Sequence, residues 1–232
     1  MSSLEGSVAL VTGASRGIGL AIGEALLAND ARVVRMARSL ATTSIENCTD
    51  FKCDVTNEDE VCRTIARVIE SVGVPDIVVN NAGTFMLKPL AETTKQEFDN
   101  SLRVNLTGPF LVLRELLPYL IKKDRAHIVT IGSIADHVPF PGNAAYGSSK
   151  YGLRGLHEVL ARELQGTDVR TTLISPGPTD TGLWDELSGA GDRTVADRAN
   201  MLYAEDVAQA VLFAVSMPAR ANVDLIRISP LA

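Results

Sequence analysis

An α/β fold is predicted by this sequence, with a doubly wound parallel sheet of seven strands flanked by helices in a single domain over residues 1–232. Three observations support this prediction. Apolar runs of strand length alternate with longer helical patterns along the chain. A glycine-rich turn joins the first apolar run directly to a helical pattern. Polar residues gather where apolar runs end, the edge at which parallel α/β sheets bind ligands.

The composition is that of an ordinary globular chain, with 46% hydrophobic and 22% charged residues, which is enough for a sizeable core. The formal net charge of −6 argues against a general nucleic-acid surface, because phosphate binding draws on clustered Lys and Arg. We therefore expect a small molecule as the partner.

The cysteines and histidines show neither a disulfide framework nor a metal-binding pattern. Cys48, Cys53 and Cys62 are odd in number and lack C-x-x-C spacing, and the three histidines have no metal spacing. Residues 1–6 lack a basic and apolar leader, and charges interrupt every long apolar run. We expect a cytoplasmic protein with no metal and no membrane partner.

The first element is an apolar strand over residues 7–12, followed by a glycine turn and a helix over residues 20–27. Such a turn can be purely structural. Its place between the first strand and a helix favours pyrophosphate binding, because glycines allow close approach and the helix N-terminus attracts anions. The candidates for cofactor binding here are Gly13, Ser15, Arg16, Gly17, Ile18 and Gly19.

The second strand, residues 31–37, ends where a dinucleotide fold places the adenosine ribose. An Asp or Glu there would favour NAD, but this chain has Ala37-Arg38-Ser39, with Arg16 in the preceding turn. We therefore predict that NADP(H) is preferred over NAD(H), with the guanidinium groups binding its 2′-phosphate.

A loop or short helix is expected over residues 39–50, before a third strand over residues 51–55. Asp54, at the end of that strand, either caps the helix 58–72 or contacts adenine; Thr56 or Asn57 could also be the cap.

The fourth strand and its exit turn cover residues 76–83. Asn81 can bond neighbouring backbone there, while Ala82 and Gly83 leave room for a flat cofactor. Helices follow over residues 94–105 and 110–122, and Asn105 stands in an apolar stretch, where it is either a functional or a structural hydrogen-bonding residue.

The fifth strand, residues 126–133, ends at Ser133, whose hydroxyl can contact a substrate oxygen or simply belong to a turn. A serine hydrolase is disfavoured because the G-x-S-x-G elbow is absent, although His127 and His137 keep it formally open.

A helix to about residue 165 carries Tyr146 and Lys150, four residues apart and so on one face. A positive charge about 5 Å away, at an effective dielectric of about 20, would favour phenolate by roughly 3 kcal/mol. Such a charge would lower the pKa of Tyr146 toward the range that suits acid/base catalysis. Taken alone, the same spacing is more often that of a plain surface pair, and the rest of the chain must decide between the two.

The chain ends with a sixth strand over residues 169–174, a helix over 204–215 and a last strand over 223–228. Residues 182–201, with Leu183, Trp184 and Leu187, form a substrate lid or a disordered connection. Apolar residues suggest an apolar or aromatic substrate, although core packing explains several of them equally well; they are Phe85, Met86, Leu87, Phe140, Leu183 and Trp184.

Several motifs stand in one order along the chain. They are Thr12-Gly13-x-x-x-Gly17-x-Gly19, Asn80-Asn81-Ala82-Gly83, Asn105, Ser133, Tyr146-x-x-x-Lys150 and Pro176-Gly177-x-x-x-Thr181. With this set the chain resembles the short-chain dehydrogenase/reductase family over nearly its whole length. The resemblance implies a Rossmann-type domain with strand order 3-2-1-4-5-6-7.

The resemblance also implies the catalytic roles. Tyr146 would exchange a proton with the substrate oxygen, Ser133 would orient that oxygen, Lys150 would lower the tyrosine pKa and hold the nicotinamide ribose, and Asn105 would anchor a proton-relaying water. The implied cofactor contacts beyond the glycine turn are Ala37, Arg38, Asp54, Val55, Asn81, Ala82, Gly83, Tyr146, Lys150, Pro176, Gly177, Thr179 and Thr181. Gly132 departs from the pattern, because many relatives have a second serine there.

The expected function is hydride transfer between NADP(H) and a carbonyl or secondary alcohol, as in a carbonyl reductase, with Tyr146 as general acid/base. A homotetramer or homodimer is implied by the family. The alternative is a non-catalytic NADP(H)-binding sensor or scaffold on the same fold, which could have lost the tyrosine. A sugar-nucleotide epimerase is disfavoured by the short chain.

Overall fold

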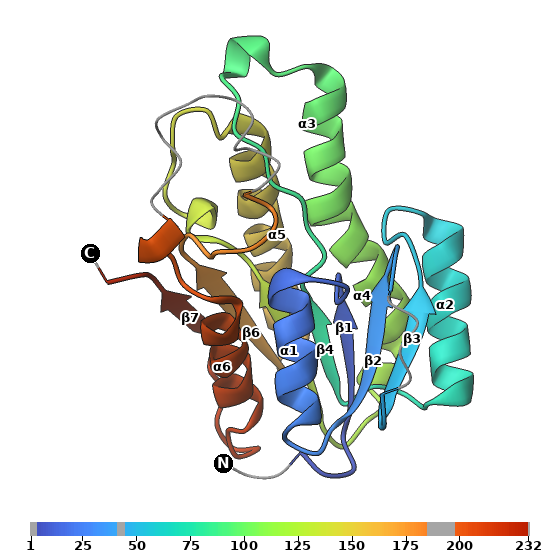
Figure 1. Cartoon of the computed structure of the whole chain (residues 1–232). Coiled ribbons are helices and arrows are strands. Elements are labelled where there is room, and N and C mark those ends of the chain that lie inside the picture. Colours follow the sequence, from blue (N-terminus) through green and yellow to red (C-terminus); the bar gives the residue numbers. More distant parts are fainter. Residues whose placement is uncertain (1–3, 41–44, 185–197, 232) are drawn as a thin grey trace.

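The computed structural model describes residues 4–40, 45–184 and 198–231 (Figure 1). Its centre is a seven-stranded parallel sheet with the order β3-β2-β1-β4-β5-β6-β7, as the family resemblance implied. The strands are β1 Val8–Thr12, β2 Arg32–Ala37, β3 Cys48–Lys52, β4 Ile77–Asn80, β5 Ala126–Ile131, β6 Val169–Pro176 and β7 Leu225–Ile228. The order reverses between β1 and β4, the point at which a doubly wound sheet opens a crevice for ligands.

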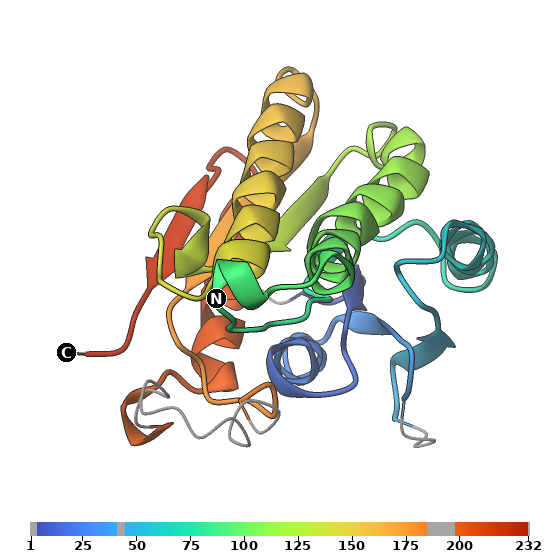
Figure 2. The same cartoon turned by 90° about the horizontal axis from the view of Figure 1, so that it is seen from above.

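Helices cover both faces of this sheet. The longer ones are α1 Gly17–Leu27, α2 Glu58–Ser71, α3 Lys95–Leu102, α4 Gly108–Leu120, α5 Ala144–Glu163 and α6 Ala204–Val215. Seen from above, α1 and α6 lie on one face and α4 and α5 on the other (Figure 2). Within the described chain, no helix combines the length and the apolar character needed to cross a membrane.

The central strands are buried on both faces of the sheet. Successive side chains along each strand point alternately into two hydrophobic cores, one on each face. Leu10, Val34 and Val78 pack in the core under α2, α4 and α5. Val11, Val33 and Val79 pack in the core under α1 and α6. Continuous apolar runs are typical of parallel strands covered by helices on both faces, which is why their prediction from sequence worked.

The third strand was predicted three residues too late. It spans Cys48–Lys52 rather than residues 51–55, and most of its side chains are at least partly exposed. This edge strand has no apolar run to reveal it, because it is held by backbone pairing with β2 and by an ion pair. In that pair Arg35 Nε and Nη2 donate to the two carboxylate oxygens of Asp50, each at 2.7 Å.

The two helices predicted around Asn105 form one continuous helical path. Thr94 caps α3 in a capping box with Glu97, and a π-helical turn, Arg103–Thr107, leads directly into α4. Pro109 lies in the first turn of α4, directly after the π-helical turn. The path brings Asn105 to the carboxyl ends of the strands, with α3 rising beyond the sheet (Figure 1).

Candidate active site

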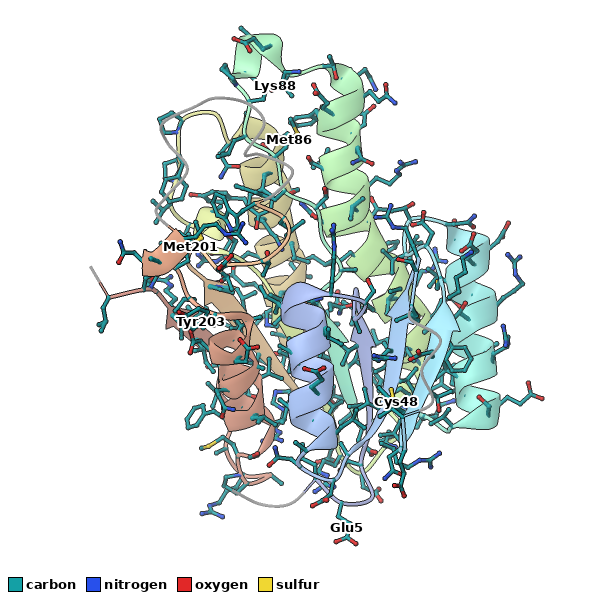
Figure 3. All side chains as sticks on the ribbon, viewed as in Figure 1. Glu5, Cys48, Met86, Lys88, Met201 and Tyr203 are labelled. Atoms are coloured by element: carbon teal, nitrogen blue, oxygen red, sulfur yellow. The ribbon has the colours of Figure 1, made fainter. Side chains whose placement is uncertain are left out.

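A single large cavity of about 840 Å³ opens at the carboxyl ends of the strands, among the residues that the structure describes. Every residue predicted to bind the cofactor lines it, and so do Ser133, Tyr146 and Lys150. The segment after β4 rises past this edge of the sheet, with Met86 and Lys88 along it (Figure 3). The structure thus brings together residues that lie more than 160 positions apart in the chain.

The glycine turn packs so closely on the turn after β4 that side chains are excluded from it. A Cβ on Gly13, where φ is +67°, would lie 2.7 Å from the Cα of Ala82. A Cβ on Gly19 would lie 2.4 Å from Nδ2 of Asn81. At the start of α1, Arg16 occupies the N-cap without a side-chain capping hydrogen bond. A glycine turn that opens a helix in this way fits a dinucleotide pyrophosphate.

Thr12 and Asn81 join the ends of β1 and β4. The hydroxyl oxygen of Thr12 accepts from the backbone N–H groups of Asn81 and Ala82, both at 3.0 Å. Nδ2 of Asn81 donates to the carbonyl oxygen of Thr12 at 2.9 Å. The predicted backbone-bonding role of Asn81 is therefore what the structure shows. Thr12, named from the sequence only as part of the glycine motif, supports the turn through its hydroxyl group.

Positive charge gathers near Asp54. Partial burial on its own raises the pKa of Asp54, but two hydrogen bonds from Thr56 and the charges of Arg38 and Arg103 lower it overall. Asn57, rather than Asp54, caps α2. Arg103, at the start of the π-helical turn, also lines the cavity, and its charge acts on Asp54 together with that of Arg38. The sequence carries no signal for this role, because Arg103 stands in a helical stretch far along the chain from Arg38.

Tyr146 and Lys150 lie in the first turns of α5, facing Ser133 at the end of β5. Nζ of Lys150 is 5.7 Å from the centroid of the Tyr146 ring and donates to the carbonyl oxygen of Ile131 at 3.0 Å. The arrangement supplies a phenol, a hydroxyl and an ammonium group around one point of the cavity wall.

The predicted direction of the Tyr146 pKa is wrong for this structure. Burial raises the pKa of Tyr146 to about 12, against a lowering by the hydrogen bond with Ser133 and a further rise from the charge of Asp136. Burial also lowers the pKa of Lys150 to about 8, while Asp136 opposes that shift. The prediction counted the attraction between phenolate and ammonium but not the loss of water around both groups.

Asn105 lies behind the cavity wall and is fully buried. Its Nδ2 donates to Oγ of Ser149 at 2.9 Å and to the carbonyl oxygen of Thr84 at 3.0 Å, and its Oδ1 accepts from the Thr84 N–H at 2.8 Å. These bonds tie α5 to the segment after β4, so Asn105 has the structural hydrogen-bonding role that was one of the two alternatives expected from the sequence. Its role in anchoring a water molecule stays a prediction.

Aromatic rings line the cavity beside Tyr146. Phe85 meets Tyr146 edge to face, with centroids 4.8 Å apart, and meets Trp184 at 5.2 Å. Trp184 is held by a hydrogen bond from Nε1 to the carbonyl oxygen of Thr179 at 2.8 Å. Within the expected lid, residues 185–197, including Leu187, lie outside the described residues.

The fold and the cavity define an oxidoreductase of the Rossmann type. The family model described as short chain dehydrogenase matches residues 7–190, and the chain belongs to this family. An oxidoreductase of Staphylococcus epidermidis is 33% identical over 99% of this chain and 100% of its own length. A 3-oxoacyl-[acyl-carrier-protein] reductase of Buchnera aphidicola is 34% identical over 78% of this chain and 77% of its own.

Solved structures show the same fold. A serine dehydrogenase in its closed form, complexed with NADP+, matches with a TM-score of 0.89 and 27% identity, over 96% of this chain and 94% of its own. A metagenomic short-chain oxidoreductase in complex with NADP matches with a TM-score of 0.80 and 31% identity over the full length of both chains. These relatives support the oxidoreductase prediction and do not favour the sensor or scaffold alternative.

Proposed function

We propose that the protein is an NADPH-preferring reductase that converts an apolar or aromatic ketone or aldehyde into the alcohol. The observation that carries this proposal is the place of Ser133, Tyr146 and Lys150 on the wall of one cavity that the glycine turn and Arg38 also line. The bound nicotinamide supplies the hydride, and the protein supplies position, electrostatics and a proton.

In this proposal Ser133 and Tyr146 both donate hydrogen bonds to the carbonyl oxygen of the substrate. As the hydride adds to the carbonyl carbon, the C=O π electrons move onto oxygen, and the forming alkoxide takes the phenolic proton of Tyr146. The ammonium group of Lys150 stabilises the resulting phenolate, which regains a proton from solvent. A pKa of about 12 keeps Tyr146 protonated before the step, which suits reduction of the carbonyl.

NADPH preference rests on the charges at the end of β2. Arg38 lines the cavity directly after Ala37, and no carboxylate stands at residues 37–39 to bind a ribose hydroxyl and repel a phosphate. Arg103, whose charge acts on the same carboxylate as that of Arg38, adds to the positive potential there.

The apolar substrate class rests on the aromatic wall around Phe85 and Trp184. The charged residues among those described as lining the cavity are Arg16, Arg38, Asp54, Arg103 and Lys150. Arg16 belongs to the glycine turn, Arg38 and Arg103 act on Asp54, and Lys150 is catalytic in this proposal. A substrate carboxylate would thus meet no dedicated cation on the described aromatic wall, whereas an aromatic ring would find ring partners.

A homodimer or homotetramer in the cytoplasm completes the proposal. Helix α5 exposes Tyr151 and Val159, and α4 exposes Phe110 and Tyr119, each by more than 40%. Large apolar side chains on two neighbouring helices favour a second copy as the partner. Light scattering after size exclusion would test this, and a monomer at micromolar concentration would contradict it.

The decisive experiment is oxidation of NADPH and NADH against a panel of aromatic ketones, aliphatic ketones, aldehydes, diketones and 3-oxoacyl thioesters, together with reduction of NADP+ by serine. Binding of both cofactors is measured in parallel. We expect turnover with NADPH and the highest kcat/KM for aromatic or apolar carbonyls. Tight cofactor binding without turnover over the whole panel would contradict the reductase proposal, and a preference for serine or a thioester would contradict the substrate class.

A further inference from the structure

Asp136 is a buried carboxylate beside the proposed catalytic serine, with 1% of its surface exposed. Its Oδ2 accepts from Oγ of Ser175 at 2.5 Å and from the backbone N–H of Ser133 at 3.3 Å. Its Oδ1 lies 2.6 Å from Nδ1 of His137. Burying a carboxylate costs several kcal/mol unless hydrogen bonds replace its water, so this set of partners makes a charged Asp136 tenable.

The glycine before Ser133 makes the room for this carboxylate. A Cβ on Gly132 would lie 2.5 Å from Oδ2 of Asp136 and 3.2 Å from Oγ of Ser175. A serine at position 132, as the family pattern often has, would collide with the carboxylate. Gly132, Asp136 and Ser175 therefore form one unit, and the departure from the family pattern at Gly132 acquires a physical reason.

The same unit fixes the backbone of Ser133. The Ser133 N–H donates to the Asp136 side chain, and the Asp136 N–H donates to the Ser133 carbonyl oxygen at 2.8 Å. Oγ of Ser133 accepts from the N–H of Ala135 at 3.2 Å, which leaves its own proton available for another acceptor. This reciprocal capping of the turn Ile134–Asp136 holds the hydroxyl where it bonds Tyr146.

The negative charge of Asp136 also acts on both titrating groups of the site. Near Tyr146 lie Lys150 and Asp136. Near Asp136 lie the imidazole of His137 and the guanidinium of Arg154, whose Nη1 is 4.0 Å from Oδ1. Asp136 raises the pKa of Tyr146 and raises that of Lys150. Both effects favour the protonated form of the pair.

We propose that Asp136 is a positioning residue: its hydrogen bonds orient Ser133, and its buried carboxylate adds to the effects that hold the phenol in the protonated state used by carbonyl reduction. This inference rests on the proposed function. Carbonyl reduction starts from the protonated phenol, and a nearby anion disfavours the phenolate.

The test is the pH profile of Asp136→Asn, which keeps the size of the side chain and removes its charge. Removing the charge of Asp136 should lower the pKa of Tyr146 and that of Lys150 together. The alkaline limb of the pH profile of kcat/KM for carbonyl reduction should therefore move to a pH lower by about one unit. At neutral pH and saturating substrates, kcat for reduction relative to kcat for oxidation should fall by about tenfold, while the kcat/KM products keep the ratio that the equilibrium constant sets. The matched control is Asp168→Asn, which removes an exposed carboxylate that stands just before β6, at the opposite end of the sheet, and should not move the limb.

Ionisation of Tyr146 can be followed without any turnover. Tyrosinate absorbance is titrated up to about pH 11 for the wild type and for Asp136→Asn, each minus its own Tyr146→Phe derivative. We expect the subtracted signal to appear at lower pH in Asp136→Asn. A folded Asp136→Asn protein with an unchanged titration would overturn the inference, even if the reductase activity is confirmed. If no substrate is turned over but the titration shifts, the electrostatic part of the inference stands and the proposed function fails.

Discussion

The two ends of the cavity are built in different ways. The cofactor end consists of backbone, with glycines at positions where a Cβ would come within 2.7 Å of the turn after β4. The catalytic and substrate end consists of side chains from distant segments, such as Phe85, Tyr146 and Trp184, held by ring contacts and hydrogen bonds. The first end is a local shape that motifs specify, whereas the second depends on how segments pack. Variants at each end should therefore fail in different ways.

Tyr146→Phe should give the largest difference between the two ends of the cavity, because it should impair catalysis and leave cofactor binding intact. Loss of the phenolic proton should lower kcat for carbonyl reduction by about 10³-fold, while the dissociation constant of NADPH stays nearly the same. Stopped assays and fluorescence titration measure the two quantities. Tyr151→Phe on the exposed side of the same helix is the matched control. A variant that retains full activity would remove Tyr146 from the mechanism.

At the cofactor end, Arg38→Asp should reverse the preference for NADPH. Losing a charged hydrogen bond to phosphate, worth about 2 kcal/mol, and adding a repelling carboxylate should change the ratio of kcat/KM for NADPH and NADH by about 10²-fold. Arg32→Asp, an exposed residue at the opposite end of β2, is the control and should leave the ratio unchanged. Equal ratios in both variants would refute phosphate recognition by Arg38.

Beneath the catalytic end lie two buried histidines whose pKa values are lowered by burial, to about 4 for His157 and about 3 for His127. Each ring is hydrogen-bonded to a threonine hydroxyl. Nδ1 of His157 is 2.9 Å from Oγ1 of Thr130, and Nε2 of His127 is 2.8 Å from Oγ1 of Thr172. Because the unfolded value is about 6.5, the unfolded chain takes up protons first as the pH falls. The stability that each neutral histidine contributes is therefore fully present above pH 6.5. It is lost as the pH falls from 6.5 toward the pKa of that histidine in the folded protein.

The expected loss is about 2 kcal/mol per histidine between pH 6.5 and pH 5. Urea unfolding of the wild type and of His157→Gln at about pH 7.5 and pH 5 measures it. His157→Gln should be less stable at the higher pH but should lose less on acidification. An identical pH dependence in the two proteins would show that His157 already takes up a proton in the folded state.

The smallest effect should come from Phe85→Leu at the substrate end. Replacing the ring removes edge-to-face contacts worth about 1 kcal/mol, so KM for an aromatic ketone should rise about fivefold, with little change for a small aliphatic one. Phe110→Leu on α4, where the ring is 43% exposed, is the matched control. Equal losses for both substrates would mean that Phe85 supports Tyr146 rather than the substrate.

Local patterns were enough to predict much of this protein. Buried parallel strands appear as apolar runs, the glycine turn marks close backbone approach, and the four-residue spacing places Tyr146 and Lys150 on one helix face. Each of these features depends on neighbours in the chain. The sequence by itself therefore determined most strands of the sheet, the end of the sheet at which the cavity opens, and the family.

Tertiary structure decided the rest. The start of β3 depends on pairing with β2, and Arg103 lines the cavity from the start of the π-helical turn. Asp136 acquires its role from Gly132 and from Ser175, 39 positions away. Most clearly, the pKa of Tyr146 rises instead of falling. Spacing in the chain tells which charges are near each other, but desolvation depends on everything packed around them, and only the folded chain determines that.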